Sequence, residues 1–328
     1  MNTATIFKKP KFIVLFAVIC TFLWGSAFPF VKTGYKLMSI ESGDISSTIL
    51  FAGVRFLTAG IITLIICRLF KLDKNIITTK AFFSSYGNKK FITSCIILSL
   101  FMTSLQYTCF YIGLSNASGV NGSIINSSGT IFTVILAFIV YKSDKPTLIK
   151  LLGCLLSFIG ILAINFRTVD LNAVHSLSDL GRNAGLEIFT MQGEGLLFFA
   201  SLSAAVGTIF NKNYTQTYNP ITLTGFQLAF GGLCLTIIGL LTGGSLNFSG
   251  VKAVLVLIYL SILSAIAITL WSTLLKYNNA SKVSVFKFLT PIFGVLLSGL
   301  ILRENILNIW VGISLLLTCA GIVLMQRK

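Results

Sequence analysis

Stretches of about twenty apolar residues recur along nearly the whole chain, and most charged residues lie between them. A helix needs about 20 mostly apolar residues to cross the hydrocarbon core of a bilayer, since each residue adds about 1.5 Å. Ten such stretches are visible, and each predicts one transmembrane helix. They cover approximately residues 12–33, 46–69, 91–114, 119–141, 147–166, 194–213, 220–242, 252–276, 281–302 and 306–326.

The composition agrees with this pattern. Apolar residues make up 55% of the chain and charged residues only 10%, whereas soluble domains carry roughly 25% charge. We therefore expect an all-α integral membrane protein. A net charge of +16 would suggest nucleic-acid binding in a soluble protein. Here the basic residues lie mostly in links, where they set topology and meet anionic lipid, so no nucleic-acid partner is expected.

The basic residues are distributed unevenly between the two sides. If the N-terminus lies inside, 17 basic residues fall in inner segments and five in outer ones, while Lys32, Arg55 and Lys287 lie within spans. Inner loops of membrane proteins are enriched in Lys and Arg. The count predicts a multi-pass protein of the cell (cytoplasmic) membrane with both termini in the cytoplasm.

The ten spans divide into two halves that resemble each other at an offset of 161 residues. GTIFTVILAFIV at 129–140 resembles TPIFGVLLSGLI at 290–301, and Gly160 falls opposite Gly321. Because five is odd, the second half enters the membrane from the opposite side, which predicts two inverted five-helix repeats around a central cavity. The expected divisions are a first repeat at 1–166, an extracytoplasmic link at 167–193 and a second repeat at 194–328.

Several short motifs resemble the EamA-type ten-helix members of the drug/metabolite transporter superfamily. They are Trp24-Gly25-Ser26, Arg55, the run from Asn279 to Pro291, and Leu302-Arg303-Glu304. The resemblance covers almost the whole chain. It implies ten helices in two inverted repeats around a cavity, and movement of small metabolites, often outward. The first half has Lys142-Ser143-Asp144 where the second has Arg303-Glu304, and the resemblance does not define a substrate.

Polar and aromatic residues inside the spans are candidates for lining that cavity. Tyr107 and Tyr111 lie one turn apart on a stripe that Thr103 begins and Gln106 flanks. Trp24 lies about twelve residues into its span, too deep for an interfacial anchor. The substrate-binding set expected from this pattern is Trp24, Gln106, Tyr107, Tyr111, Asn126 and Trp271, the last on the same face as Ser264. Hydrogen bonding between helices is the open alternative for these polar residues.

Two cations, Arg55 and Lys287, complete the expected substrate-binding set. An unpaired charge at their depth costs several kcal/mol, and all nine acidic residues lie in links or at span ends. The repeat places Lys287 opposite Asn126, and a weaker similarity pairs Arg55 with Gln227. A positive cavity should attract anionic, carboxylate-bearing compounds.

Prolines are expected to interrupt two spans. Pro291 follows Lys287 by one turn and frees a backbone carbonyl at that level, and Pro29 predicts a comparable break in the first span. Both are candidate hinges. An alternative role for Lys287 is to bond the carbonyl groups freed at Pro291.

The leading hypothesis is a transporter that exports amino acids or related carboxylates by alternating access. A membrane scaffold or receptor-like protein without transport, or a drug exporter, remains an alternative. The spans contain no ring of charged residues of the kind that channels use. They also contain no nucleophile–base pair of the kind that an enzyme would need. All seven cysteines fall within spans and indicate packing. No metal or cofactor is expected; the partners are a small-molecule substrate and the lipid bilayer, and the oligomeric state is open but compatible with a monomer.

Overall fold

The computed structural model confirms an all-helical protein with multiple membrane-spanning helices. It describes residues 3–41, 43–76, 79–116, 119–142, 144, 147–165, 190–248, 250–302 and 309–326, and no strand occurs in these ranges. Within them eight helices are long and apolar enough to cross a membrane, and two shorter apolar helices, Ile125–Val140 and Leu148–Ala163, bring the number to ten. Most of the predicted link at 167–193, the Arg303-Glu304 pair and Lys328 lie outside the described residues.

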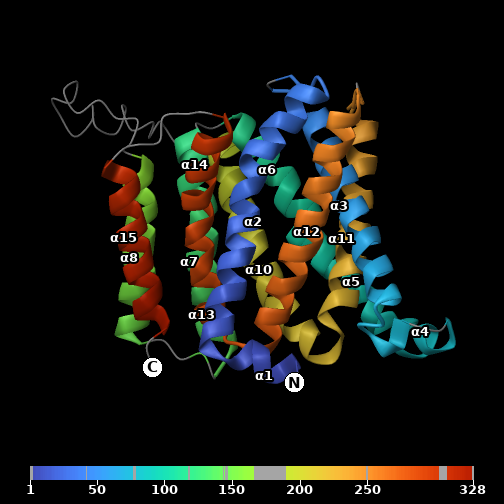
Figure 1. Cartoon of the computed structure of the whole chain (residues 1–328), viewed down its shortest axis with the longest axis horizontal. Coiled ribbons are helices and arrows are strands. Elements are labelled where there is room, and N and C mark those ends of the chain that lie inside the picture. The colour runs from blue at the N-terminus through green and yellow to red at the C-terminus, as the bar shows by residue number, and fades with distance from the viewer. Residues whose placement is uncertain are drawn as a thin grey trace.

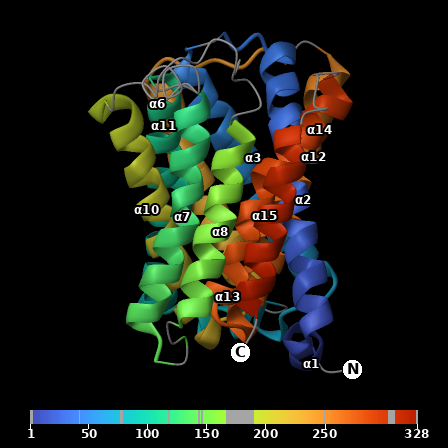
Figure 2. The same ribbon diagram turned by 90° about the vertical axis from the view of Figure 1, so that its left-hand side faces the viewer.

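The helices follow the predicted spans to within a few residues. Figures 1 and 2 show the long helices side by side, all running roughly up and down between the two ends of the bundle. The first half contains α2 (Pro10–Leu37), α3 (Ile45–Leu69), α5 (Lys89–Ser99), the π-helical turn η2 (Leu100–Ser104), α6 (Leu105–Ser115), α7 (Gly119–Val140) and α8 (Leu148–Asn165). The second contains the π-helical turn η5 (Met191–Gly195), α10 (Leu196–Thr217), α11 (Pro220–Leu241), α12 (Val251–Tyr277), α13 (Ala280–Ser284), the 3₁₀ turn η6 (Val285–Phe288), α14 (Leu289–Leu302) and α15 (Ile309–Gln326).

Glycines bring α3 and α11 into close contact. A Cβ atom at Gly60 would lie 2.4 Å from the backbone nitrogen of Ala229, and one at Gly232 would lie 2.2 Å from that of Leu57. Small residues let membrane helices approach until their backbones touch. Gly53, seven residues before Gly60, makes the same kind of contact, since its Cβ position lies 2.4 Å from the backbone nitrogen of Thr236.

The contact between α8 and α15 is reciprocal. A Cβ atom at Gly160 would lie 2.5 Å from Oγ1 of Thr318, and one at Gly321 would lie 2.2 Å from Oγ of Ser157. Gly160 and Gly321 are 161 residues apart, as are Ser157 and Thr318. Two equivalent surfaces that meet in this way are related by a two-fold operation, so the contact obeys the offset seen in the sequence.

The first span of each half also packs against equivalent helices of the other half. The first span, α2, packs against α12 and α14, while the sixth, α10, packs against α6 and α7. Each half therefore inserts its first span against the third and fourth spans of the other half. This is the arrangement expected of inverted repeats; the boundaries at residues 166 and 194 remain predictions.

Both chain termini lie at the same end of the bundle, hereafter the terminal end (Figure 1). There the side-chain amide of Asn278 donates to the carbonyl of Phe7 at 2.9 Å, and that of Gln326 donates to the carbonyl of Lys282 at 2.8 Å. An even number of spans produces this result. Three short helices outside the spans were not predicted from the sequence: α1 (Thr3–Lys8), the 3₁₀ turn η1 (Lys74–Ile76) and α4 (Thr79–Tyr86).

A buried carboxylate attaches α4 to the bundle. Asp73 accepts hydrogen bonds from the hydroxyls of Tyr86 in α4 and Thr222 in α11. Burial raises the pKa of the Tyr86 hydroxyl, and its hydrogen bond to Asp73 and the Asp73 charge raise it further. Tyr86 therefore stays protonated and donates.

The two predicted proline breaks have different outcomes. In the ninth span α13 gives way to the 3₁₀ turn η6 just before Pro291, which then lies in the first turn of α14, a position where proline is well tolerated. The expected break at Pro29 is wrong, because α2 continues through this residue from Pro10 to Leu37. One missing N–H in a helix of 28 residues removes a single hydrogen bond, and the rest hold the helix together.

Replacing Gly60 with alanine should destabilise the protein, because the new methyl group would overlap the backbone of α11. Overpacking of this kind costs about 1–3 kcal/mol. Thermal unfolding of the purified protein measures the effect. Gly312→Ala is the matched control, since no atom lies within 4 Å of its Cβ position. Equal melting temperatures for the two variants would contradict the close α3–α11 contact.

Candidate functional site

Three of the predicted residues meet at the break in the ninth span. Lys287 on η6 places its Nζ atom 6.0 Å from the ring centre of Trp24 on α2 and 5.4 Å from that of Trp271 on α12. The two indole rings lie 5.0 Å apart. Trp271 is only 1% exposed, while Lys287 and Trp24 are half-buried. An ammonium ion is attracted to indole faces at such distances, so this arrangement holds a cation inside the bundle. We call Lys287, Trp24 and Trp271 the Lys287 cage.

This cage contains two hydrogen-bond donors without acceptors. Among the described residues, no hydrogen bond or ion pair involves the Lys287 ammonium group, whose neighbours are the two rings. The buried indole N–H of Trp271 also lacks an acceptor there. A buried donor without an acceptor costs about 1–3 kcal/mol. The bond from Lys287 to a carbonyl freed at Pro291 is not seen in this part of the chain.

A second group surrounds Arg55 on α3. Its Nε donates to the hydroxyl of Ser264 at 3.0 Å, and its guanidinium carbon lies 5.1 Å from the ring centre of Phe56. Phe56 packs on Tyr107 at 4.6 Å between ring centres, and Tyr107 lies 6.1 Å from Tyr111. Arg55 is 6% exposed, and no acidic residue in the described ranges pairs with it.

Both groups contact one face of α12. Ser264 and Trp271 are seven residues apart on this helix, which is about two turns, or about 10 Å along the axis. The prediction that they share a face is confirmed. The Arg55 group and the Lys287 cage therefore lie at two levels of the bundle interior, with the cage nearer the terminal end.

The Arg55 contact has an uncharged counterpart in the other half. Gln227 on α11 donates from Nε2 to the hydroxyl of Thr103 at 3.3 Å, and Thr103 is 161 residues before Ser264. Each of these contacts joins the second or seventh span to the other half of the chain. Thr103 lies in the π-helical turn η2 and faces α11. It therefore forms a hydrogen bond between helices, which is the alternative to cavity lining for these polar residues.

Two predicted residues do not join either group. Asn126 is exposed on α7, and Gln106 is half-buried on α6. Neither makes a hydrogen bond or ring contact to the Lys287 cage or the Arg55 group in the part of the chain that the structure describes. Their roles in substrate binding remain predictions.

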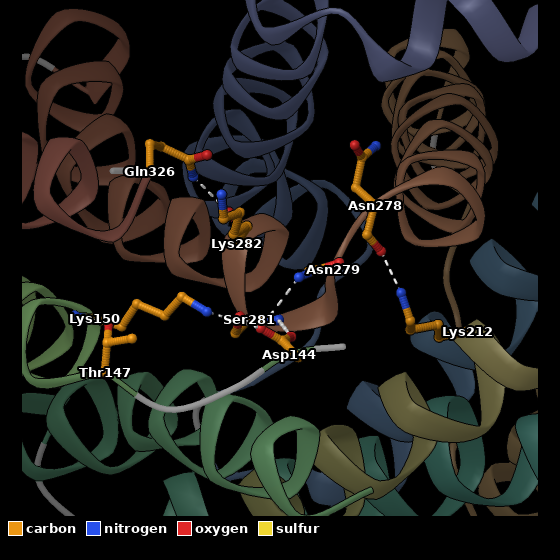
Figure 3. A network of polar contacts seen from close by, with 9 residues as sticks. All are labelled: Asp144, Thr147, Lys150, Lys212, Asn278, Asn279, Ser281, Lys282 and Gln326. Atoms are coloured by element: carbon orange, nitrogen blue, oxygen red, sulfur yellow. Dashed lines mark hydrogen bonds and ion pairs between the residues drawn. The ribbon is translucent and has the colours of Figure 1, made fainter. Parts of the chain in front are cut away.

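Sequence reasoning missed a polar network at the terminal end. Asp144, which follows α7, is 1% exposed and accepts hydrogen bonds from the backbone nitrogen of Ser281 at 3.0 Å and from its hydroxyl. Lys150 lies 3.6 Å from the Asp144 carboxylate, and Asn279 donates to it at 3.5 Å. Figure 3 shows these side chains converging between the α7–α8 connection and the start of α13. The sequence did offer one sign of this network, because Asp144 is an acidic residue among basic ones in a short link.

Two further contacts hold the same region in place. Lys212 on α10 donates to the carbonyl groups of Leu275 and Asn278 at the end of α12, and Gln326 at the end of α15 donates to that of Lys282 on α13. The segment that leads to Lys287 is therefore fixed by Asp144, which follows α7, and by residues from α10 and α15. We call Asp144, Lys150, Asn279 and Ser281 the terminal network.

Comparisons with known proteins agree with this architecture. A model of the EamA-like transporter family matches residues 11–166 and 191–327. An uncharacterized transporter of Archaeoglobus fulgidus is 27% identical over 97% of this chain and 99% of its own length. The uncharacterized transporter sll0355 of Synechocystis sp. is 28% identical over 66% of each chain. A solved crystal structure superposes with a TM-score of 0.71 over 97% of both chains at 12% identity, which shows likeness of fold.

Replacing Lys287 with methionine should leave the melting temperature unchanged or raise it. Methionine keeps the length of the side chain, and the change removes a charge that lies inside the bundle without a described hydrogen-bond partner. Lys212→Met is the matched control, because it removes bonds to two backbone carbonyls and should lower the melting temperature. An equal loss in both variants would show that Lys287 serves the fold.

Proposed function

This chain belongs to the EamA-like transporter family, and we propose that it exports small carboxylate-bearing metabolites, amino acids or related acids, by alternating access. The observation that carries the proposal is the Lys287 cage. An ammonium group and an indole N–H lie inside the membrane bundle without an acceptor among the described residues. A substrate carboxylate would supply that acceptor.

The chemistry of the cage favours an organic anion. A lysine ammonium group offers three donors, and a charge-assisted hydrogen bond contributes about 1.5–3 kcal/mol. The faces of Trp24 and Trp271 would pack against the apolar part of the same molecule. A positive interior repels lipophilic cations, which argues against a multidrug exporter of such compounds.

The positions of the acids bear on energy coupling. The buried carboxylates of the described chain, Asp73, Asp144 and Glu194, lie at the ends of spans. None of them is placed beside Arg55 or Lys287 to exchange a proton with the substrate site. This arrangement supports facilitated diffusion or exchange as the mode of transport.

The terminal network supports alternating access. It joins the α7–α8 connection of the first half to α13 of the second, and α13 leads directly into η6, which carries Lys287. Opening this end would break the contacts of Asp144 and release the segment that bears the cage. A set of contacts that closes one end of a passage is the kind of two-state element that alternation requires.

The distribution of charge supports the direction of insertion. The terminal end carries most of the basic residues and would face the cytoplasm, with both chain termini on that side. A pocket of about 310 Å³ opens there beside the network, and Lys212 and Lys276 are among the residues that line it. Such a pocket would collect anionic metabolites from the cytoplasm.

The direct test is flux through proteoliposomes. Lys287→Met should lower transport of a carboxylate substrate by at least about tenfold, since one charge-assisted contact is lost. Lys252→Met is the matched control, because Lys252 is exposed at the opposite end of the bundle. Its flux should equal that of the wild type.

Two results would contradict the proposal. Unchanged flux in a well-folded Lys287→Met protein would remove this residue from the site. A wild-type protein that moves no carboxylate at all would favour the scaffold or receptor alternative.

The network can be tested by hydrogen exchange. Asp144→Asn replaces a charged acceptor of the Ser281 N–H with a neutral one, so amides in Ala280–Ser284 should exchange about tenfold faster. Asp44→Asn is the control, because Asp44 accepts from the backbone of Ser47 at the start of α3. It should alter exchange only there. Unchanged exchange at 280–284 in Asp144→Asn would show that Asp144 does not hold this end closed.

A further inference from the structure

Arg55 is a buried cation, and only one of its guanidinium nitrogen atoms makes a hydrogen bond in the described part of the chain. It is 6% exposed in the interior of the bundle, and no acid among the described residues lies within ion-pair distance of it. Its Nε atom donates to Ser264, whose own hydroxyl donates to the carbonyl of Leu260. The two terminal amino groups make no described hydrogen bond and form the part of a guanidinium that can hold a carboxylate with two parallel bonds.

The surroundings of Arg55 are rich in hydroxyl groups. Tyr107 and Tyr111 on α6 and Tyr35 on α2 all lie within electrostatic range of the guanidinium group. Phenol hydroxyls donate to anions. Two neighbouring helices, α2 and α6, therefore contribute phenol hydroxyls around one positive charge.

A purely structural role does not explain the charge. The equivalent contact in the other half is made by Gln227 and Thr103 at 3.3 Å, so a neutral amide is sufficient to join the helices. A charge inside a membrane bundle is more costly to keep than a neutral amide. The difference between Arg55 and Gln227 points to a use beyond packing.

We propose that Arg55 is a second anion-binding point and that the transported compound carries two acidic groups, one held by Arg55 and the other by Lys287. This inference rests on the proposed function, in which Lys287 binds a carboxylate. The contact points of the two cations on α12, Ser264 and Trp271, are about 10 Å apart along the helix axis. A charge-assisted contact of about 2.7–2.9 Å at each end leaves room for a short carbon chain, so the substrate class is a dicarboxylate.

The experiment compares pairs of acids that differ by one carboxylate. The flux of each acid is measured separately in proteoliposomes that contain the full chain. The first pair is butanoate and succinate, and the second is hexanoate and adipate. The wild type should transport the dicarboxylate of at least one pair about tenfold better than its partner. Arg55→Gln, which copies Gln227, should lose that preference by reducing dicarboxylate flux while monocarboxylate flux stays within about twofold. Lys287→Met should reduce flux of both classes.

Further measurements keep the outcomes distinct. Arg55→Lys keeps the charge and should retain the dicarboxylate preference. Thermal stabilisation of the wild-type protein by each acid gives a reading that does not depend on any variant folding, and the dicarboxylate should stabilise more. Equal flux and equal stabilisation by both members of every pair would overturn the second binding point and leave the proposed function standing. No flux of any acid would overturn both.

Discussion

The interior of the bundle must satisfy its polar groups without water, and this constraint explains most of its contacts. Helices meet through glycines where their backbones touch, as at Gly60 and Gly232. Buried hydroxyls donate mostly to carbonyls, and buried carboxylates stay at span ends where donors are available. Against this background two cations stand out, because Arg55 and Lys287 have no acidic partner among the described residues.

The halves share their packing but differ in charge. Reciprocal contacts between α8 and α15 follow an offset of 161 residues, and the Arg55–Ser264 contact has its counterpart in Gln227–Thr103. The same offset pairs Lys287 with Asn126. In both of these pairs one half carries a positive charge where the other carries a neutral amide.

The sequence predicted the helices well because length and hydropathy alone determine which segments can span a bilayer. It also selected Trp24, Trp271 and Lys287, since deep aromatic and charged residues are costly in lipid. It could not show that these three meet, because they lie on helices far apart in the chain and only tertiary packing joins them. Asp144 was missed for a related reason, as its partner Ser281 is 137 residues away. Asn126 is exposed on α7, and its part in substrate binding remains a prediction.

The nature of the bound ligand is the most direct measure of what the two cations do. Purified protein can be screened for thermal stabilisation by a set of metabolites that includes organic anions, neutral compounds and lipophilic cations. A positive interior predicts that organic anions raise the melting temperature and that Lys287→Met abolishes the rise. Stabilisation by lipophilic cations, unchanged in Lys287→Met, would contradict an anion site in the bundle.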